Sequence, residues 1–339
     1  MVWNKVDSII LFNFSSYWIH PLINKYLNTK ENITPSEHYE GILILRKNKK
    51  PLWLSHPFNY TQAKKTFTNI EVKTYTTKKQ LETILSKNCG KKIGFDSNHT
   101  TINRLKSMRK IFKKESGVKL IDVTKYLGEI REIKDEEEIQ KIKIAVNKTR
   151  ETLNKIKNEL KEGITEKEVY LKIKNYFEKS GFELGFCIVA FGENTSNIHH
   201  VSSSKKLEKE SAVLIDAGAK YKGYYADLTQ SYWFGKKEPT TYTNLIKKIN
   251  ESILRVEEKL KEGTKANELW EACKIKMSHA LGHGIGVEEH DYPTGIGAKS
   301  NWKLKKGMII AIEPAIYTKQ FGIRIEHDYL ITKKGFEKL

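Results

Sequence analysis

The pattern of hydrophobic and polar positions divides the 339-residue chain into two parts, 1–122 and 123–339. In the first part, short apolar runs alternate with stretches of helical periodicity, which predicts an α/β domain with a mixed or parallel sheet. Strands are predicted at 8–12, 41–46, 51–54, 92–95 and 118–122, and helices at 59–67, 78–87 and 100–115. Four scattered histidines lack ligand spacing, so structural or exposed positions are predicted for His20, His38, His56 and His99.

The second part opens with two predicted amphipathic helices. Asp135 and Glu138 have capping-box spacing, and the apolar face that follows continues to Leu160. Thr165 and Glu168 have the same spacing at the start of a second helix. Both helix starts are therefore predicted from local hydrogen bonding alone.

A second copy of this arrangement follows in the carboxy-terminal third of the chain. Leu160-Lys-Glu-Gly-Ile-Thr165 resembles Leu260-Lys-Glu-Gly-Thr264, and each segment joins a long helix to a shorter one. The shorter helix of the second copy is predicted over 266–277. Beyond each segment lies an apolar hairpin with two acids. Offsets of 97 and 99 residues relate Glu313 to Asp216 and Glu326 to Asp227. The second part is therefore predicted to be a duplicated helix–helix–hairpin unit with a pseudo-twofold axis.

Each acid pair is predicted to lie across its hairpin. A turn centred near Tyr221 and Lys222 would place Asp216 opposite Asp227, and Glu313 and Glu326 are symmetric about Lys319 and Gln320 in the same way. Four carboxylates at a common centre raise one another's pKa, because like charges at short range repel. Two divalent cations about 3.5–4 Å apart would relieve this repulsion and activate a water molecule for hydrolysis.

Two short segments supply histidines that could complete such a site. His279 and His283 are four residues apart, but the glycines on both sides of His283 indicate closely approaching backbone rather than a helix. His290 ends the same segment. The pair His199 and His200 precedes the first acidic hairpin.

Together these motifs resemble the creatinase/prolidase/methionine aminopeptidase family of metallopeptidases, which has the pita-bread fold. The resemblance is strong over 123–339 and implies a catalytic α+β pita-bread domain there. It is looser over 1–122, where it implies the smaller α/β amino-terminal domain of prolidases and Xaa-Pro aminopeptidases. The matching motifs are Asp216-Ala-Gly with Ala-Asp227, Gly282-His283-Gly-Ile-Gly with His290, Ile312-Glu313-Pro and Arg324-Ile-Glu326.

The resemblance also implies roles for single residues. Asp216 would bind one metal ion through both oxygens, Asp227 and Glu326 would bridge two ions, and Glu313 would also be the general base. The catalytic histidines would be His199 and His290. The motif position favours His199 over its neighbour His200. The implied metal ligands are Asp216, Asp227, His283, Glu313 and Glu326, and the implied substrate contacts are His199, His279, His290 and Arg324, the last paired with the ligand shell. The ions would be Mn²⁺ or Co²⁺, with Zn²⁺ or Fe²⁺ as alternatives.

The activity implied is hydrolysis of the Xaa-Pro bond in dipeptides or short peptides. The amino-terminal domain favours this over a methionine aminopeptidase, which remains the alternative. A dipeptidase needs a cation for the free carboxylate of its substrate, and 291–310 offers lysines but no arginine. Dipeptidase and aminopeptidase therefore both stay open, and the resemblance implies a homodimer.

Composition changes this picture only slightly. The net charge of +19 comes largely from lysines interspersed with acids, so a lysine-rich surface is expected rather than a nucleic-acid site. A non-catalytic relative that binds RNA or ribosomes is the alternative from another class. Three distant cysteines, the absence of a signal-peptide pattern and the absence of an apolar run of about 18 residues predict a cytoplasmic protein without a membrane span.

Overall fold

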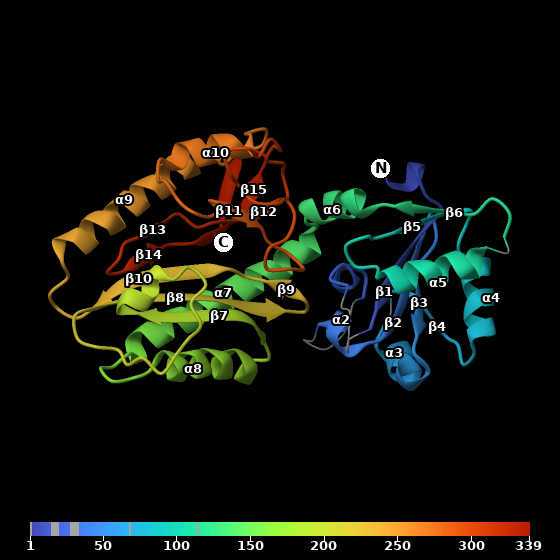
Figure 1. The fold of residues 1–339 in the computed structure, drawn as a ribbon, viewed down its shortest axis with the longest axis horizontal. Helices are drawn as coiled ribbons and strands as arrows, with labels where there is room; N and C mark the ends of the chain where they lie inside the picture. The colour runs from blue at the N-terminus through green and yellow to red at the C-terminus, as the bar shows by residue number, and fades with distance from the viewer. Residues whose placement is uncertain (1, 15–19, 28–33, 68, 114) are drawn as a thin grey trace. The chain divides into compact units, whose positions relative to one another are not determined.

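The computed structural model describes residues 2–14, 20–27, 34–67, 69–113 and 115–339. The chain divides into two compact units, Met1–Ile130 and Arg131–Leu339 (Figure 1). Helix α6 (Thr124–Glu132) crosses this division. Each unit has its own hydrophobic clusters.

The amino-terminal unit is built on one mixed sheet. Its strands are β1 (Ser8–Asn13), β2 (Gly41–Arg46), β3 (Leu52–Ser55), β4 (Glu71–Thr74), β5 (Lys92–Phe95) and β6 (Lys119–Asp122), in the spatial order β4-β3-β2-β1-β5-β6. Its helices are α1 (Ile23–Tyr26), α2 (Pro35–His38), α3 (Tyr60–Thr66), α4 (Lys78–Asn88) and α5 (Ile102–Phe112), with short 3₁₀ turns at Val2–Asn4 and Pro57–Asn59. Strands β1, β2 and β3 pair antiparallel, whereas β1–β5, β5–β6 and β3–β4 pair parallel, which confirms the predicted α/β class.

Successive side chains of the central strand β1 point to opposite faces of the sheet, and both faces are covered by buried apolar residues. Ile9 and Leu11 of β1 belong to one buried cluster, and Ile10 and Phe12 belong to the other. The sequence pattern did not predict β4, because this edge strand carries two charged residues and none of its side chains is fully buried. Charged edge strands of this kind lack the apolar run on which strand prediction depends.

The carboxy-terminal unit contains two helix pairs and two main sheets. The helices are α7 (Glu136–Glu159), α8 (Glu166–Lys179), α9 (Thr240–Glu257) and α10 (Ala266–Cys273). The first sheet holds β7 (Glu183–Phe191), β8 (Ser211–Tyr221), β9 (Tyr224–Tyr225) and β10 (Leu228–Phe234). The second holds β11 (Gly282–Gly284), β12 (Ile309–Ile312), β15 (His327–Thr332) and β16 (Gly335–Lys338), and a ribbon of β13 (Ala315–Tyr317) and β14 (Gly322–Arg324) lies beside them. Helices α7 and α8 cover the first sheet, and α9 and α10 lie beside the second (Figure 1).

Both predicted capping boxes are present. The Asp135 carboxylate accepts the Glu138 backbone N–H at 3.0 Å while the Glu138 carboxylate accepts the Asp135 N–H, and Thr165 and Glu168 form the same reciprocal pair. Caps of this kind stabilise a helix by about 1 kcal/mol. The apolar face of α7, including the fully buried Val146, packs on the first sheet.

The duplication predicted from the sequence is present in the backbone hydrogen bonding. Gly163 N–H donates to the Leu207 carbonyl at 2.8 Å, and Gly263 N–H donates to the Leu304 carbonyl at 2.9 Å. The two acceptors are 97 residues apart, the same offset that relates Asp216 to Glu313. The two halves thus have equivalent contacts, as a pseudo-twofold pita-bread fold requires.

The first acidic hairpin turns one position later than predicted. Lys222 and Gly223 both have positive φ, 50° and 84°, and form the two-residue turn between β8 and β9. Asp216 therefore pairs with Thr229, and its predicted pairing with Asp227 is wrong. Moving the centre of a turn by one position changes each partner by two, so the two acids remain on one face of the ladder.

The second hairpin keeps the predicted register, but its strands are interrupted. Ile312 pairs with His327 on one side of the interruption, and Ala315 pairs with Arg324 on the other. The two glutamates lie in the gap between these ladders, where Pro314 cannot donate a backbone hydrogen bond.

Helix α10 ends earlier than predicted. It stops at Cys273 rather than near Met277, because Lys274 adopts the left-handed conformation with φ 55°. An irregular segment then leads from the helix to His279 and β11.

Candidate metal centre

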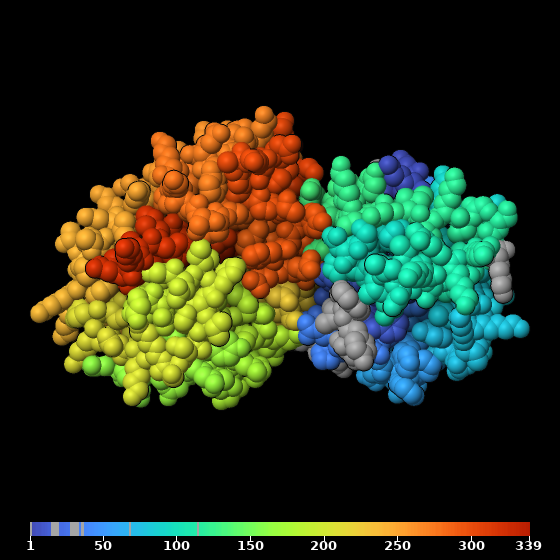
Figure 2. Space-filling view, in the orientation of Figure 1, coloured from blue at the N-terminus to red at the C-terminus, as the bar shows by residue number. Residues whose placement is uncertain are grey.

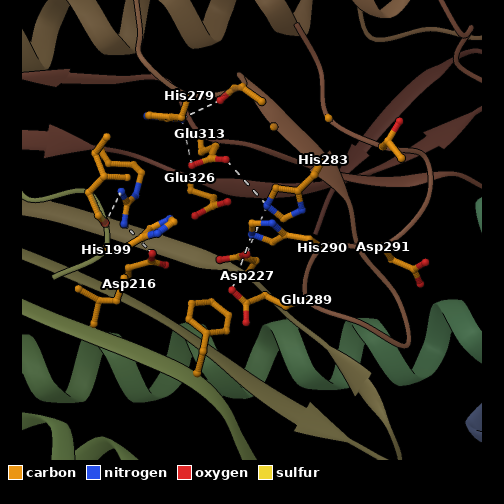
Figure 3. A pocket seen from close by; sticks show the side chains of 18 residues that line it. His199, Asp216, Asp227, His279, His283, Glu289, His290, Asp291, Glu313 and Glu326 are labelled. Carbon is orange, nitrogen blue, oxygen red and sulfur yellow. Dashed lines mark hydrogen bonds and ion pairs between the residues drawn. The ribbon is translucent and has the colours of Figure 1, made fainter. Parts of the chain in front are cut away.

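Acidic and imidazole side chains from both halves of the unit converge in one pocket (Figure 3). The predicted ligands come from β8, from the link between β9 and β10, from β11 and from the two interruptions of the second hairpin. These residues are Asp216, Asp227, His283, Glu313 and Glu326. The structure therefore brings together all five.

Their ligand atoms fall into adjoining groups. One atom each from Asp216, Asp227 and Glu326 lies within 4.8 Å of the others, and the same holds for His283, Glu313 and Glu326. Because bonds from a divalent ion to oxygen or nitrogen are about 2.0–2.2 Å long, either group can surround one ion. Glu326 belongs to both groups, which is the arrangement expected of a bridging ligand.

Among the five predicted ligands, three buried carboxylate oxygens lack hydrogen-bond donors within the described part of the chain. They are Oδ1 of Asp216, Oδ1 of Asp227 and Oε1 of Glu326. A buried carboxylate without compensation is costly, so such groups are normally paired or bound to a metal ion. These donor atoms fit a divalent cation.

Burial and mutual repulsion raise the pKa of several of these acids. The pKa of Asp227 lies well above its usual value because of burial and then the charge of Glu326. Burial, followed by the same neighbouring charge, raises the pKa of Glu313. The pKa of Glu326 rises to about 7 through burial and the charge of Asp216. A cation would remove this penalty by neutralising the carboxylates.

His283 presents one ring nitrogen to the acids. Its Nδ1 lies 3.0 Å from the Gly284 carbonyl, and a proton placed there leaves Nε2 unprotonated, 3.6 Å from Asp227 Oδ2 and 3.9 Å from Glu313 Oε1. Burial and then His290 lower the pKa of His283 to about 4, which keeps the imidazole neutral as a ligand.

The backbone at Gly282 explains how His283 is held. A Cβ at Gly282 would lie 1.9 Å from the carbonyl oxygen of Ala311, so only glycine allows β11 to approach β12 this closely.

Arg324 orients the acid on β8. Its Nη2 donates to Asp216 Oδ2 at 2.6 Å, its Nη1 donates to the Tyr317 hydroxyl at 2.8 Å and its Nε donates to Thr229 at 3.2 Å. The Thr229 hydroxyl in turn donates to Glu326 Oε2 at 2.7 Å. This network fixes two carboxylates in place, as the surrounding contacts of metal sites commonly do.

The structure also locates the other predicted histidines. His199 lines the pocket, whereas Nε2 of His200 lies 2.8 Å from Glu166 Oε2, outside it. The exposed ring of His290 lies over that of His283 at a centroid distance of 4.0 Å (Figure 3). His279 lies at 3.7 Å from a Glu313 oxygen and 3.3 Å from the Tyr317 hydroxyl.

Some residues around the centre were not singled out by sequence reasoning. Glu289 lines the pocket, and burial, followed by the charge of Asp216, raises its pKa to about 7. Thr229 and the fully buried Asp328 hydrogen-bond to the centre, the latter by accepting the Asp227 N–H at 3.0 Å. The position of Glu289 beside His290 was a usable signal, but Thr229 was recognisable only from the register of the hairpin.

The pocket has a cavity volume of about 360 Å³ and an apolar wall formed by Phe186, Ile188 and Ile198. This volume is at the lower end of the roughly 300–1,000 Å³ typical of small-ligand sites. In Figure 2, the yellow-green surface of the first half of the carboxy-terminal unit borders the orange-to-red surface of its second half. The cavity therefore suits a short peptide better than a folded protein.

Comparison with known proteins agrees with this geometry. Residues 140–333 match the family described as Metallopeptidase family M24, and residues 27–133 match the Creatinase/Prolidase N-terminal domain. A Staphylococcus epidermidis protein named uncharacterized peptidase is 30% identical over 95% of this chain and 93% of its own length. A Methanocaldococcus jannaschii protein with the same designation is 34% identical over 71% of this chain and 77% of its own.

Solved structures share the fold over nearly the whole chain. The prolidase from Pyrococcus horikoshii has a TM-score of 0.84 at 26% identity and covers 100% of this chain and 94% of its own. The X-Pro aminopeptidase from Thermotoga maritima has a TM-score of 0.87 at 24% identity, with coverage of 98% and 95%.

The fold and these matches define a metallopeptidase with the pita-bread fold, and hence a hydrolase. The chain belongs to metallopeptidase family M24, whose members depend on metal ions. Within the described ranges, every helix is too short or too polar to cross a lipid bilayer.

Proposed function

We propose that this protein is an exopeptidase that uses two divalent metal ions to hydrolyse the Xaa-Pro bond at the amino end of short peptides. The observation that carries the proposal is the pair of three-atom ligand groups that share Glu326. Bound there, the ions would neutralise the carboxylates and activate water for attack on the peptide carbonyl. Asp216, Asp227, His283 and Glu313 are the proposed ligands besides Glu326, and Mn²⁺ or Co²⁺ are the proposed ions.

The protein side chains then have separate tasks. Glu313 takes the proton of the attacking water and returns it to the proline nitrogen when the peptide bond breaks. His199 and His290 line the cavity and would donate hydrogen bonds to the oxygen that becomes negatively charged. His279 and Arg324 act by position, since each contacts the Tyr317 hydroxyl as well as one of the acids.

Basic groups at the cavity bear on the choice of substrate. Among the described residues that line it, Arg324 is the one arginine, lysine is absent, and the guanidinium is already paired with Asp216. A dipeptide places its free carboxylate next to the scissile bond and needs a cation there. Peptides longer than two residues are therefore the favoured substrates, and the prediction of a homodimer stands beside this proposal.

The test is turnover of Ala-Pro, Ala-Pro-Phe and Met-Ala-Ser by the metal-free protein supplied with Mn²⁺, Co²⁺ or Zn²⁺ in turn. We expect release of alanine from Ala-Pro-Phe at the greatest rate and no cleavage of its N-acetylated form. Faster hydrolysis of Met-Ala-Ser would identify a methionine aminopeptidase instead. Absence of cleavage of all three peptides with every metal would refute the proposal.

A further inference from the structure

A second group of potential metal ligands lies in the amino-terminal unit. Asp96 directly follows β5 and His99 comes three residues later, whereas His20 follows the neighbouring strand β1. Strands β1 and β5 run parallel, with Ile10 paired to Phe95, so the segments that follow them meet at one edge of the sheet. The sequence showed no ligand spacing here, because parallel pairing joins segments that are far apart in the chain.

The three side chains meet at one oxygen. His20 Nε2 lies 3.2 Å and His99 Nδ1 lies 3.0 Å from Asp96 Oδ2, and the two imidazole centroids are 4.6 Å apart. One ligand atom from each residue lies within 4.8 Å of the others. Ligands bound tetrahedrally at about 2.0–2.2 Å are roughly 3.3–3.6 Å apart, so an ion requires the two nitrogen–oxygen distances to open by only a few tenths of an ångström.

The carboxylate is oriented from its other side. Asp96 Oδ1 accepts the Asn98 backbone N–H at 3.0 Å and lies 2.9 Å from the Thr124 hydroxyl. These contacts direct Oδ2 toward the two imidazoles. Contacts of this kind to the outer oxygen are typical of carboxylates that bind metals.

Charge balance also favours a cation. Asp96 is only 4% exposed, and His20 is 1% exposed. Within the described ranges, the ion-pair partners of Asp96 are the two histidines alone. Two imidazolium rings this close would repel each other, so at most one of the two histidines can balance the Asp96 charge by protonation. A divalent cation held by all three groups balances that charge while both imidazoles stay neutral.

We infer that His20, Asp96 and His99 form a second metal-binding site, for Zn²⁺ or a similar divalent transition-metal ion, separate from the proposed catalytic centre. Two imidazoles and one carboxylate are ligands that suit Zn²⁺ and leave a position open to water. The His99 side chain is 20% exposed, which gives an ion access from solvent. The bound ion ties the segments after β1 and β5 together.

The test compares the full-length wild-type protein with His99→Gln and Asp96→Asn. Each chain is freed of metal, dialysed to equilibrium against Zn²⁺ and analysed for metal by mass spectrometry. We expect both variants to bind one Zn²⁺ fewer per chain than the wild type, and to lose the corresponding part of the visible absorption when Co²⁺ is used. His38→Gln, which removes an exposed histidine outside the group, is the matched control and should bind as much as the wild type.

Equal Zn²⁺ content in the wild type and His99→Gln would overturn the inference and leave an Asp–His hydrogen-bond network. Circular dichroism checks that each variant is folded. If Asp96→Asn, which changes a buried residue, does not fold, the Zn²⁺ content of His99→Gln alone decides whether the site exists. The expected difference of one ion does not depend on peptidase turnover. Failure of this site and failure of the proposed activity are therefore distinguishable.

Discussion

The substitution Glu326→Gln should stabilise the metal-free protein while impairing its metal-bound form. The Glu326 side chain is almost fully buried and its pKa is raised to about 7 by burial and the charge of Asp216. Glutamine keeps an oxygen to accept the Thr229 hydroxyl and adds an amide that can donate to the carboxylate oxygens lacking donors nearby.

The magnitude and the sign follow from proton linkage. An acid with a raised pKa binds more protons when folded than when unfolded, so the contribution of Glu326 to the stability of the metal-free wild type falls as pH rises from 4.5 to about 7 and is level above that. This rise in pKa corresponds to about 3 kcal/mol. Metal-free Glu326→Gln should therefore be more stable than the wild type by up to about 3 kcal/mol at pH 8 and similar at pH 4.

The assay is urea unfolding in the presence of EDTA at both pH values, repeated with Mn²⁺. Two ions, each at about one hundred times its Kd, stabilise the wild type by about 5 kcal/mol in total, and the variant should gain much less, which reverses the order of stability at pH 8. Glu178→Gln, on the exposed face of α8, is the matched control and should show neither effect. The reasoning would be refuted if the metal-free variant were less stable than the wild type at pH 8. It would also be refuted if the difference in unfolding free energy between the two proteins were the same at both pH values.

Three further changes test the centre. Asp227→Asn should lower turnover by at least about 100-fold while the circular dichroism spectrum is unchanged, and wild-type turnover would remove this residue from the site. Arg324→Lys should weaken metal binding by about 10–100-fold in competition with a chelator, since lysine cannot reproduce the three contacts of the guanidinium. Gly282→Ala should cost about 1–3 kcal/mol of stability and reduce the metal content, because its Cβ would meet Ala311; Gly297→Ala, which has space, should do neither.

Local patterns were sufficient for much of the fold. The capping boxes at Asp135 and Thr165 depend on side chains three residues apart, and both helix starts were predicted correctly. The duplication was also visible, because both copies retained the same turn sequence before the shorter helix. By contrast, the end of α10 depends on one left-handed residue, Lys274, which the apolar pattern does not encode.

The sequence by itself determined the fold class, the repeat and the set of acidic and imidazole residues available for a metal centre, because these depend on residue type and on spacing within single elements. Only the tertiary structure decided the register that pairs Asp216 with Thr229, the Arg324 network and the place of Glu289. It alone joined His20 to Asp96, since sheet pairing across the chain leaves no periodic trace in the sequence. Contacts between distant segments depend on how whole elements pack, and no local pattern specifies that packing.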